Sequence, residues 1–314
     1  MGKTVLILIL CTVICTGGFS QTGESKQRGF QFSFIYPVST NGISAPEYTN
    51  TVSFNMLTGI SENEKAFTFG GLVNIIRRDA YGLQFAGLYN HIGNNGKGLL
   101  FSGLASYAGK NYTGLQFSGL ANISGDISGL QFAGLVNIAK DVKGVQFAGL
   151  VNVADNSDYP IGIVNLIKNG EKGIAVTYNE TGSMLLSFRS GGRVTYGIIG
   201  YGYNHRAGKK SWVVEGGLGM HINCSPHFRI NNEIKTENLI SSENTTFKTG
   251  YHLSAAYKFI PQIEVFAGPD ISYLYSNDTD NAAMFPRRAL WKKHDSSELQ
   301  QIYIGYQLGI MYLF

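Results

Sequence analysis

The sequence has few cysteines and little charge. Only three of its 314 residues are cysteines, and Cys11 and Cys15 lie in a segment that we interpret as a signal peptide. Its removal would leave Cys224 alone, so the mature chain cannot form an intramolecular disulfide even in an oxidising compartment. Charged residues make up 15% of the chain, and the net charge of +4 lies mostly in expected turns. This distribution gives no basic footprint for nucleic acid.

Long hydrophobic runs are also missing. The most apolar stretch, from Val5 to Cys15, follows a basic start at Lys3 and precedes the small residues 16–18. It is shorter than the roughly 20 residues that a membrane-spanning helix needs, but it has the three parts of a secretory signal. We predict a signal peptide over residues 1–20 and a short linker over 21–28. Large residues precede both early cysteines, so a lipid anchor is not expected.

Motifs for catalysis and metal binding are missing as well. There is no phosphate-binding glycine loop, nucleophile elbow or Cys/His metal spacing, and the six histidines are scattered. We therefore predict no metal, no cofactor and no enzymatic activity. His221 and Asn223 share one strand face and, with a nearby serine, are similar to the Ser/His/Asn set of an outer-membrane phospholipase. Two residues do not define a catalytic geometry, so we interpret them as a polar pair lining an interior.

Glycine and aromatic residues are abundant, with 40 Gly, 19 Phe and 18 Tyr. Much of the glycine belongs to a repeat of the form Gly-Leu-Gln-Phe-Ala-Gly-Leu-Val-Asn, with copies at 82–90, 98–106, 114–122, 129–137 and 144–152. The closing Asn or Ser recurs at positions 74, 90, 106, 122, 137, 152 and 165. Such regularity predicts an array of one structural unit.

Each copy is interpreted as one strand of about ten residues and one turn. Phe132 and its second neighbours form an apolar face, whereas Gln131 and Asn137 lie on a small, mildly polar face. Two architectures fit: antiparallel strands of a barrel, or a parallel solenoid that stacks Asn on Asn. The fixed Asn favours the solenoid, but the strands hold no charge, and a water-washed face would carry some. We favour the barrel, with Phe132 facing lipid and Gln131 facing the lumen.

The C-terminal half shows cleaner alternation. In the last strand, apolar residues occupy every second position from Ile302 to Phe314, and the chain ends on that Phe. Residues 247–259 and 212–223 alternate in the same way. Aromatic residues near strand ends suit the headgroup boundary of a membrane. A soluble sandwich would explain the alternation but not the terminal Phe with Tyr312 two positions before it.

The last strand resembles those of bacterial outer-membrane β-barrel proteins, whose terminal Phe is read by the barrel-assembly machinery. That resemblance implies that Tyr312 and Phe314 form an assembly signal. The Gly-Leu-Gln-Phe-Ala-Gly-Leu-Val-Asn copies are similar to a surface-repeat family of exported Gram-negative proteins. Neither resemblance implies a known activity.

Ionisable residues on the other face of the C-terminal strands are the candidates for a lumen lining, because a barrel wall tolerates them only where they face water or one another. Their mixed signs fit either a hydrated pore of weak selectivity or a lumen closed by ion pairs. The candidates are Glu215, Arg229, Glu233, Lys235, Lys248, His252, Lys258, Glu264 and Asp270.

These observations predict an all-β protein of the outer membrane, with one antiparallel transmembrane barrel of about 16 strands over residues 29–314. Repeat-built strands would occupy about 66–178 and the remaining strands about 183–314. The alternative is a parallel solenoid joined to a C-terminal barrel or sandwich. For function, we expect a structural or passive-diffusion role with outer-membrane lipid and the assembly machinery as partners. A surface-exposed binding or adhesion module is the alternative.

Overall fold

The computed structural model describes residues 26–207, 212–240, 245–277, 279–295 and 298–314. The predicted signal peptide and residues 21–25 of the predicted linker lie outside the described residues, whereas residues 26–28 already belong to the first strand. The chain is all-β, as predicted, but it forms two units: a parallel solenoid over residues 26–167 and an antiparallel barrel over residues 172–313. No helix within the described ranges is long and apolar enough to cross a membrane.

The solenoid consists of two sheets that face each other, and their strands pair in parallel except for β2, which pairs antiparallel with β1 at the edge of the first sheet. The first sheet holds β1 (Lys26–Ile35), β2 (Val38–Ser39), β3 (Tyr48–Asn55), β5 (Asn63–Gly70), β7 (Ala80–Ala86), β9 (Gly96–Ser102), β11 (Tyr112–Ser118), β13 (Ile127–Ala133), β15 (Asp141–Ala148) and β17 (Asn156–Ile161). The second holds β4 (Thr58–Ser61), β6 (Val73–Ile76), β8 (Tyr89–Ile92), β10 (Ala105–Ala108), β12 (Ala121–Ser124), β14 (Val136–Ile138), β16 (Val151–Ala154) and β18 (Val164–Ile167). The short 3-10 helix η1 (Gly42–Glu47) follows β2.

Each repeat forms two strands, so the expectation of one ten-residue strand per copy was wrong. In the copy that begins at Gly129, β13 ends at Ala133 and β14 starts at Val136. Gly134 and Leu135 turn the chain between the two sheets, and a second turn over residues 139–140 leads to the next coil. A glycine in a strand pattern can mark such a bend.

Neighbouring repeats pair in parallel and in register, which corrects the antiparallel pairing that we expected. Gln131 lies opposite Gln116 on one side and Gln146 on the other, and Asn137 lies between Asn122 and Asn152. The repeat copies from Gly to Asn hold no charged residue, although the strands that contain them also include Lys97 on β9 and Asp141 and Lys143 on β15. The uncharged copies form an apolar outer surface on the solenoid, and not a barrel wall.

Two glycines of each repeat are required by the stacking. Gly114 and Gly129 have φ angles of 129° and 137°, a backbone conformation that favours glycine. In the turn, a Cβ built on Gly134 would lie 2.1 Å from the carbonyl oxygen of Gly119 on the preceding coil. The coils can stack only where this position has no side chain.

The barrel has eight strands, and the expected number of about 16 was wrong. They are β19 (Lys172–Asn179), β20 (Ser183–Gly191), β21 (Thr195–Asn204), β22 (Trp212–Asn223), β23 (Phe228–Leu239), β24 (Thr246–Ile260), β25 (Ile263–Ser276) and β27 (Leu299–Leu313). Successive strands pair antiparallel, and β19 pairs with β27 to close the wall. Between β25 and β27 lie the 3-10 helix η2 (Thr279–Met284) and the short strand β26 (Trp291–His294), which pairs with β27. The single barrel expected over 29–314 is thus confined to the C-terminal half.

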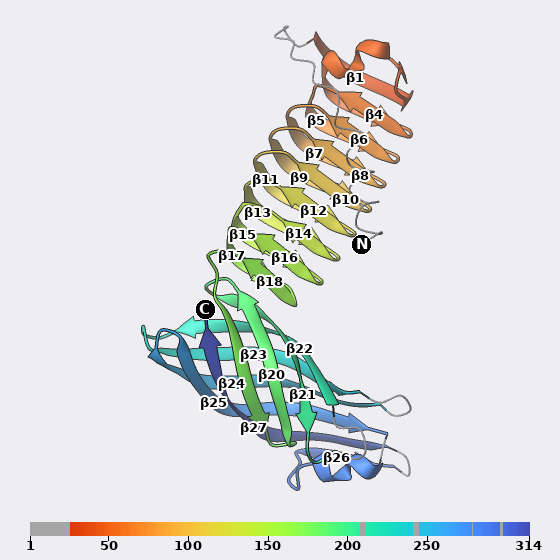
Figure 1. Ribbon diagram of the computed structural model, residues 1–314. Helices are drawn as coiled ribbons and strands as arrows, with labels where there is room; N and C mark the ends of the chain where they lie inside the picture. Colours follow the sequence, from red (N-terminus) through yellow and green to blue (C-terminus); the bar gives the residue numbers. More distant parts are fainter. Residues whose placement is uncertain (1–25, 208–211, 241–244, 278, 296–297) are drawn as a thin grey trace, which may run out of the picture.

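The solenoid is joined to one end of the barrel (Figure 1). That end holds the brief connections 192–194, 224–227 and 261–262 and the C-terminus. The opposite end holds the short connection 180–182. At that end β21 is joined to β22, β23 to β24 and β25 to β27, and η2 and β26 lie there. At the junction, the backbone nitrogen of Asn165 donates to Ser190 Oγ (3.0 Å), and Thr195 Oγ1 donates to the Pro160 carbonyl (2.7 Å).

Candidate functional site

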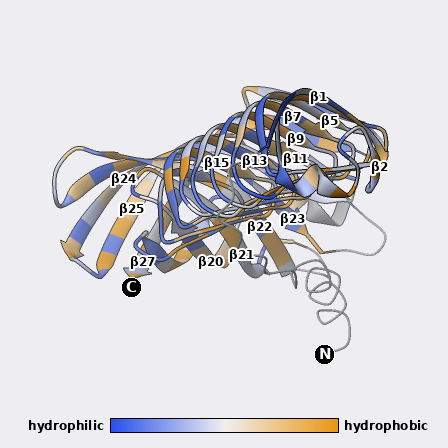
Figure 2. Cartoon of the chain, turned by 90° about the horizontal axis from the view of Figure 1, so that it is seen from above, coloured by the Kyte–Doolittle hydropathy of each residue, from blue (hydrophilic) through white to orange (hydrophobic). Residues whose placement is uncertain are grey.

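The barrel wall separates apolar from polar side chains by strand parity. Along β24, Tyr251, Leu253 and Tyr257 point outward with exposed fractions between 42% and 48%, while Lys248 and His252 are buried inside. Figure 2 shows the same alternation of hydrophobic and hydrophilic segments along β24 and β25. The outside of the barrel is therefore apolar and the inside is polar, the reverse of a water-soluble core.

All nine residues that the sequence singled out as lumen-lining candidates point into the barrel. Eight of them are at most 3% exposed, and Lys258 is partly exposed at the end nearest the solenoid. The eight are Glu215, Arg229, Glu233, Lys235, Lys248, His252, Glu264 and Asp270. They face one another closely enough to form ion pairs.

The middle of the barrel is filled by two such pairs. Arg189 Nη1 lies 2.5 Å from Glu233 Oε1, and the Tyr196 hydroxyl donates to the same carboxylate (2.7 Å). Lys235 pairs with Glu215 one strand away. All five side chains are almost fully buried. An eight-stranded barrel is just wide enough for side chains to fill its interior, and here charged pairs fill it.

At the barrel end nearest the solenoid, Glu171 contacts two cations and a histidine. Its carboxylate lies 2.6 Å from Arg229, 2.9 Å from Lys258 and 3.4 Å from His221 Nε2. Burial raises the pKa of the Glu171 carboxyl, but the hydrogen bond with His221 and the charge of Arg229 outweigh burial and hold that pKa below its usual range. Arg229 also contacts Glu264 at 2.7 Å. This cluster closes the barrel end beneath the last solenoid coil.

At the opposite end of the barrel, Glu180 is the carboxylate that contacts several neighbouring groups. It accepts hydrogen bonds from Lys248 Nζ (2.8 Å), from the Tyr303 hydroxyl (2.7 Å) and from the backbone nitrogen of Tyr306 (3.0 Å). Lys248 in turn lies 3.6 Å from Asp270. Ion pairs therefore line the barrel from one end to the other.

Sequence reasoning missed four charged members of this interior: Glu171, Glu180, Arg189 and Glu237. Glu237 shares the parity of Glu233 and Lys235, and Arg189 shares that of Ser183, Leu185 and Ser187. Both could have been found by extending the alternation. Glu171 and Glu180 lie in connections between strands, where periodicity carries no information.

The histidine and asparagine considered for lipid hydrolysis do not meet. His221 is buried, with its ring stacked on Tyr196 (4.2 Å between centroids) and its Nδ1 2.9 Å from Asn231 Oδ1. Asn223 is exposed beyond it. Across the described part of the chain, no group of three or more His, Cys, Asp or Glu side chains is arranged to hold a metal ion.

The expected assembly signal lies at the end of the strand that closes the barrel. Tyr312 pairs with Ile174 on β19 and with Ile263 on β25. Tyr312 and Phe314 are 54% and 64% exposed on the outer face. The backbone nitrogen of Phe314 donates to the Lys172 carbonyl (3.0 Å), so the last residue is held at the seam.

The solenoid has the same inverted polarity as the barrel. Gln116, Gln131 and Gln146 are fully buried. Gln146 Nε2 donates to Gln131 Oε1 (3.0 Å), Gln131 Nε2 donates to Gln116 Oε1 (3.1 Å), and Gln116 Nε2 donates to Ser124 Oγ (2.9 Å). A parallel ladder links Asn122, Asn137, Asn152 and Asn165 at 2.8 to 3.1 Å. The ladders satisfy the buried polar groups, so the interior of the solenoid is polar and the phenylalanine rings lie outside.

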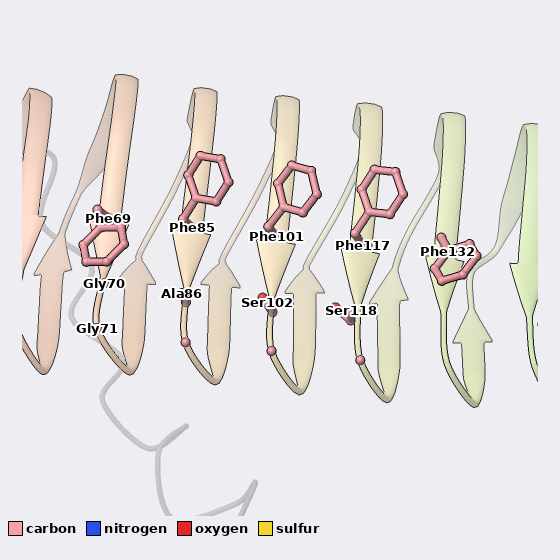
Figure 3. Close-up of a pocket in the computed structure, with 13 residues that line it drawn as sticks. Phe69, Gly70, Gly71, Phe85, Ala86, Phe101, Ser102, Phe117, Ser118 and Phe132 are labelled. Carbon is pink, nitrogen blue, oxygen red and sulfur yellow. The ribbon is translucent and has the colours of Figure 1, made fainter.

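Apolar side chains cluster near the charged turns instead. A hydrophobic cluster there includes Ile76, Ile92, Tyr112, Ile127 and Ile167. Outside, Phe69, Phe85, Phe101, Phe117, Phe132 and Phe147 form what we call the phenylalanine row. Figure 3 shows rings of this row on successive coils, and the stacked pairs have centroids 4.9 to 5.1 Å apart. Beside them runs a groove of about 480 Å³ floored by turn glycines.

Comparisons with known proteins identify no relative. No family model matches the chain, and no curated protein matches it. Two solved structures match 46% of it: a chain from "De novo design of transmembrane beta-barrels" (18% identity, 93% of that chain, TM-score 0.27) and the designed protein TMB2.3 (14% identity, 97% of that chain, TM-score 0.28).

Proposed function

We propose that this protein is an integral outer-membrane β-barrel with a structural role: a plugged barrel that anchors a solenoid. The observation that supports this proposal best is the inverted polarity of the closed barrel, with Leu253 and Tyr257 outside and the Arg189–Glu233 pair inside. In lipid, only helices and closed barrels satisfy every backbone group. In water, the same outer wall would be one continuous apolar patch, which soluble monomers rarely expose.

The interior favours a structural role over passive diffusion. Ion pairs of Glu171, Glu233, Glu215 and Glu180 follow one another along the barrel. Eight strands leave room for little besides these side chains. Planar-bilayer recording tests this part of the proposal: we expect no steady conductance, whereas stable open channels would restore the diffusion role.

The position of the solenoid favours the periplasmic side. Outer-membrane barrels have short turns on the periplasmic side and longer loops outside. The solenoid is joined to the barrel end that has the short connections 192–194, 224–227 and 261–262. We therefore place it in the periplasm, with residues 205–211 and 277–298 at the cell surface, and we expect lipid and the barrel-assembly machinery to be its partners.

A second candidate is a surface-exposed binding or adhesion module. The groove beside the half-buried Phe85, Phe101 and Phe117 favours it, because apolar surface patches mark interaction sites. The two candidates differ in the location of the solenoid. Protease added to intact cells should leave the solenoid uncut if it is periplasmic, and should remove it if it is displayed outside.

Membrane integration itself is tested by extraction. The folded protein should stay with outer membranes through carbonate washing and should migrate faster on gels when left unheated, because the outer wall around Leu253 needs lipid. A control that breaks insertion without touching the interior is Leu253→Lys, since a cation near the bilayer midplane costs about 2–4 kcal/mol. Release of the unchanged protein as a soluble monomer would refute the proposal.

A further inference from the structure

A row of leucines runs along one edge of the solenoid. Each turn between the two sheets places one of them at the surface, with exposed fractions between 40% and 47% for the six leucines. We call the row the leucine ridge; it consists of Leu72, Leu88, Leu104, Leu120, Leu135, Leu150 and Ile163. With coils about 4.8 Å apart, six spacings give a ridge about 29 Å long.

The ridge and the phenylalanine row form one apolar strip. The groove beside the rings is lined by Phe101 and its neighbours in the row and by the turn glycines, such as Gly103 and Gly119, each of which directly precedes a leucine of the ridge, and its walls are mainly apolar. Neither the Gly-Leu turns nor the groove contains a charged residue. The strip therefore has no feature that would select a charged or strongly polar partner.

The opposite edge of the solenoid carries charge. Its turns hold Lys110, Asp126, Lys140, Asp155 and Lys168. The rod is thus amphipathic across its width, with an apolar edge and a charged edge along its whole length. Amphipathic helices with such a division lie in the membrane interface, with the apolar side toward the acyl chains and the charged side toward water, and the same physical argument applies to this rod.

The apolar strip continues onto the barrel. Ile163, the last member of the leucine ridge, lines a surface hollow together with Ile174, Leu186, Ile199 and Tyr201, which point outward from β19, β20 and β21. The backbones also meet here, since a Cβ on Gly197 would lie 2.1 Å from the Ile163 carbonyl oxygen. The strip and the outer wall of the barrel are one uninterrupted apolar surface at this point.

We propose that the solenoid lies along the bilayer that surrounds the barrel, with the leucine ridge and the phenylalanine row in contact with lipid. This inference rests on the proposed function, which places the outer wall of the barrel in that bilayer. The occupant of the groove is then the acyl region of the adjacent leaflet. The charged turns face the aqueous side, and the barrel and the solenoid form one membrane-bound surface.

Spin labels test the proposal in the full-length protein. In a Cys224→Ser background, single cysteines replace Leu104 or Leu120 on the ridge, Lys110 on the charged edge as the matched control, and Leu253 on the barrel as the reference. All four sites are exposed, so the labels need no repacking. The labelled proteins are reconstituted into vesicles of phosphatidylethanolamine and phosphatidylglycerol, and accessibility to oxygen and to a water-soluble nickel chelate is measured.

We expect the oxygen-to-nickel ratio at Leu104 and Leu120 to rise well above that at Lys110 and to approach that at Leu253. A ratio equal to that at Lys110, with Leu253 still in lipid, would overturn the inference and leave the proposed function intact. Nickel access at Leu253 would instead refute the proposed function. Ridge labels shielded from both reagents, with spin broadening that disappears on dilution with unlabelled protein, would show that a second copy covers the ridge and would also overturn the inference.

Discussion

Gln131 donates a side-chain hydrogen bond of 3.1 Å to Gln116 on the preceding coil, and both side chains are completely buried. The bond exists because the two residues occupy the same register on adjacent parallel strands. A primary amide has both a donor and an acceptor, so identical amides can hydrogen bond in an endless row. This property lets the solenoid keep its polar face inside and its apolar face outside.

The asparagine ladder should contribute strongly to solenoid stability. Asn137 donates to Asn152 Oδ1 (3.1 Å) and to the Phe147 carbonyl (2.6 Å), and it accepts from Asn122 (3.0 Å). Asn137→Ala should cost about 1–3 kcal/mol for each buried group left without a partner. Asn111→Ala, at an exposed turn position, should change stability by no more than about 0.5 kcal/mol. Hydrogen exchange of the β13 to β16 amides measures both, and equal protection in the two variants would contradict the prediction.

The turn glycines should be intolerant of even one methyl group. In Gly134→Ala, the new Cβ would meet the Gly119 carbonyl oxygen at 2.1 Å, so the coils must separate. Overpacking of this kind costs about 1–3 kcal/mol. The matched control is Gly216→Ala on β22, where no atom lies within 4 Å of the added Cβ. Urea unfolding that ranks the two variants in the opposite order would show that the coil spacing can relax.

The sequence predicted the structure of the barrel half better than that of the repeat half. In β24 and β25, alternation with period two identifies both faces, and the inward charges Lys248 on β24 and Asp270 on β25 follow from it. In the repeat, Phe132 and Val136 have the same parity in one long strand or in two strands, so periodicity could not reveal the turn at Gly134. The Asn spacing did indicate stacking. The lack of charge in the repeat was taken as evidence against a solenoid. That interpretation was wrong, because it assumed that the outer face of a solenoid is polar.

Glu64 should make the first solenoid coils more stable at low pH. Burial raises the pKa of its carboxyl above the usual value, although Ser53 (2.7 Å) and Asn50 (3.1 Å) donate hydrogen bonds to it. A raised pKa means that the folded state favours the protonated form. The stability is therefore fully present below the unfolded pKa of about 4.3 and is lost as the pH rises through the folded pKa.

The variant Glu64→Gln should remove this dependence and stabilise the coil at neutral pH. Its amide oxygen can accept the same two hydrogen bonds without a buried charge. Hydrogen exchange of the β3 and β5 amides between pH 4 and pH 8, corrected for intrinsic exchange rates, gives the readout. Exposed Glu47, changed to Gln, is the control. Protection that increases with pH in the unmodified protein would contradict the sign of this prediction.

Removing one partner of an ion pair inside the barrel should lower stability more than removing both charges. Arg189→Met leaves Glu233 buried without its cation and should cost about 3–5 kcal/mol. The double variant Arg189→Met/Glu233→Gln removes both charges and should recover most of that loss. The folded fraction on unheated gels after urea titration measures each variant. Equal losses in the single and double variants would mean that the side chains act by packing, as Arg189 also lies 4.4 Å from the Phe266 ring centroid.

Phe314 should be required for assembly more than for the stability of the finished barrel. It is 64% exposed at the end of the closing strand β27, so it contributes little packing. Deleting it or changing it to Asp should leave export intact but abolish the heat-modifiable folded form in cells, if the assembly machinery reads the terminal residue. Phe259→Asp is the control, since Phe259 is equally exposed at the same end of the barrel but lies within the chain. Normal folded levels of the Phe314→Asp variant in cells would show that the terminal aromatic residue is not an assembly signal. A second measurement is refolding of the purified variant into vesicles. If it refolds at the rate of the unmodified protein, its defect in cells lies in assembly.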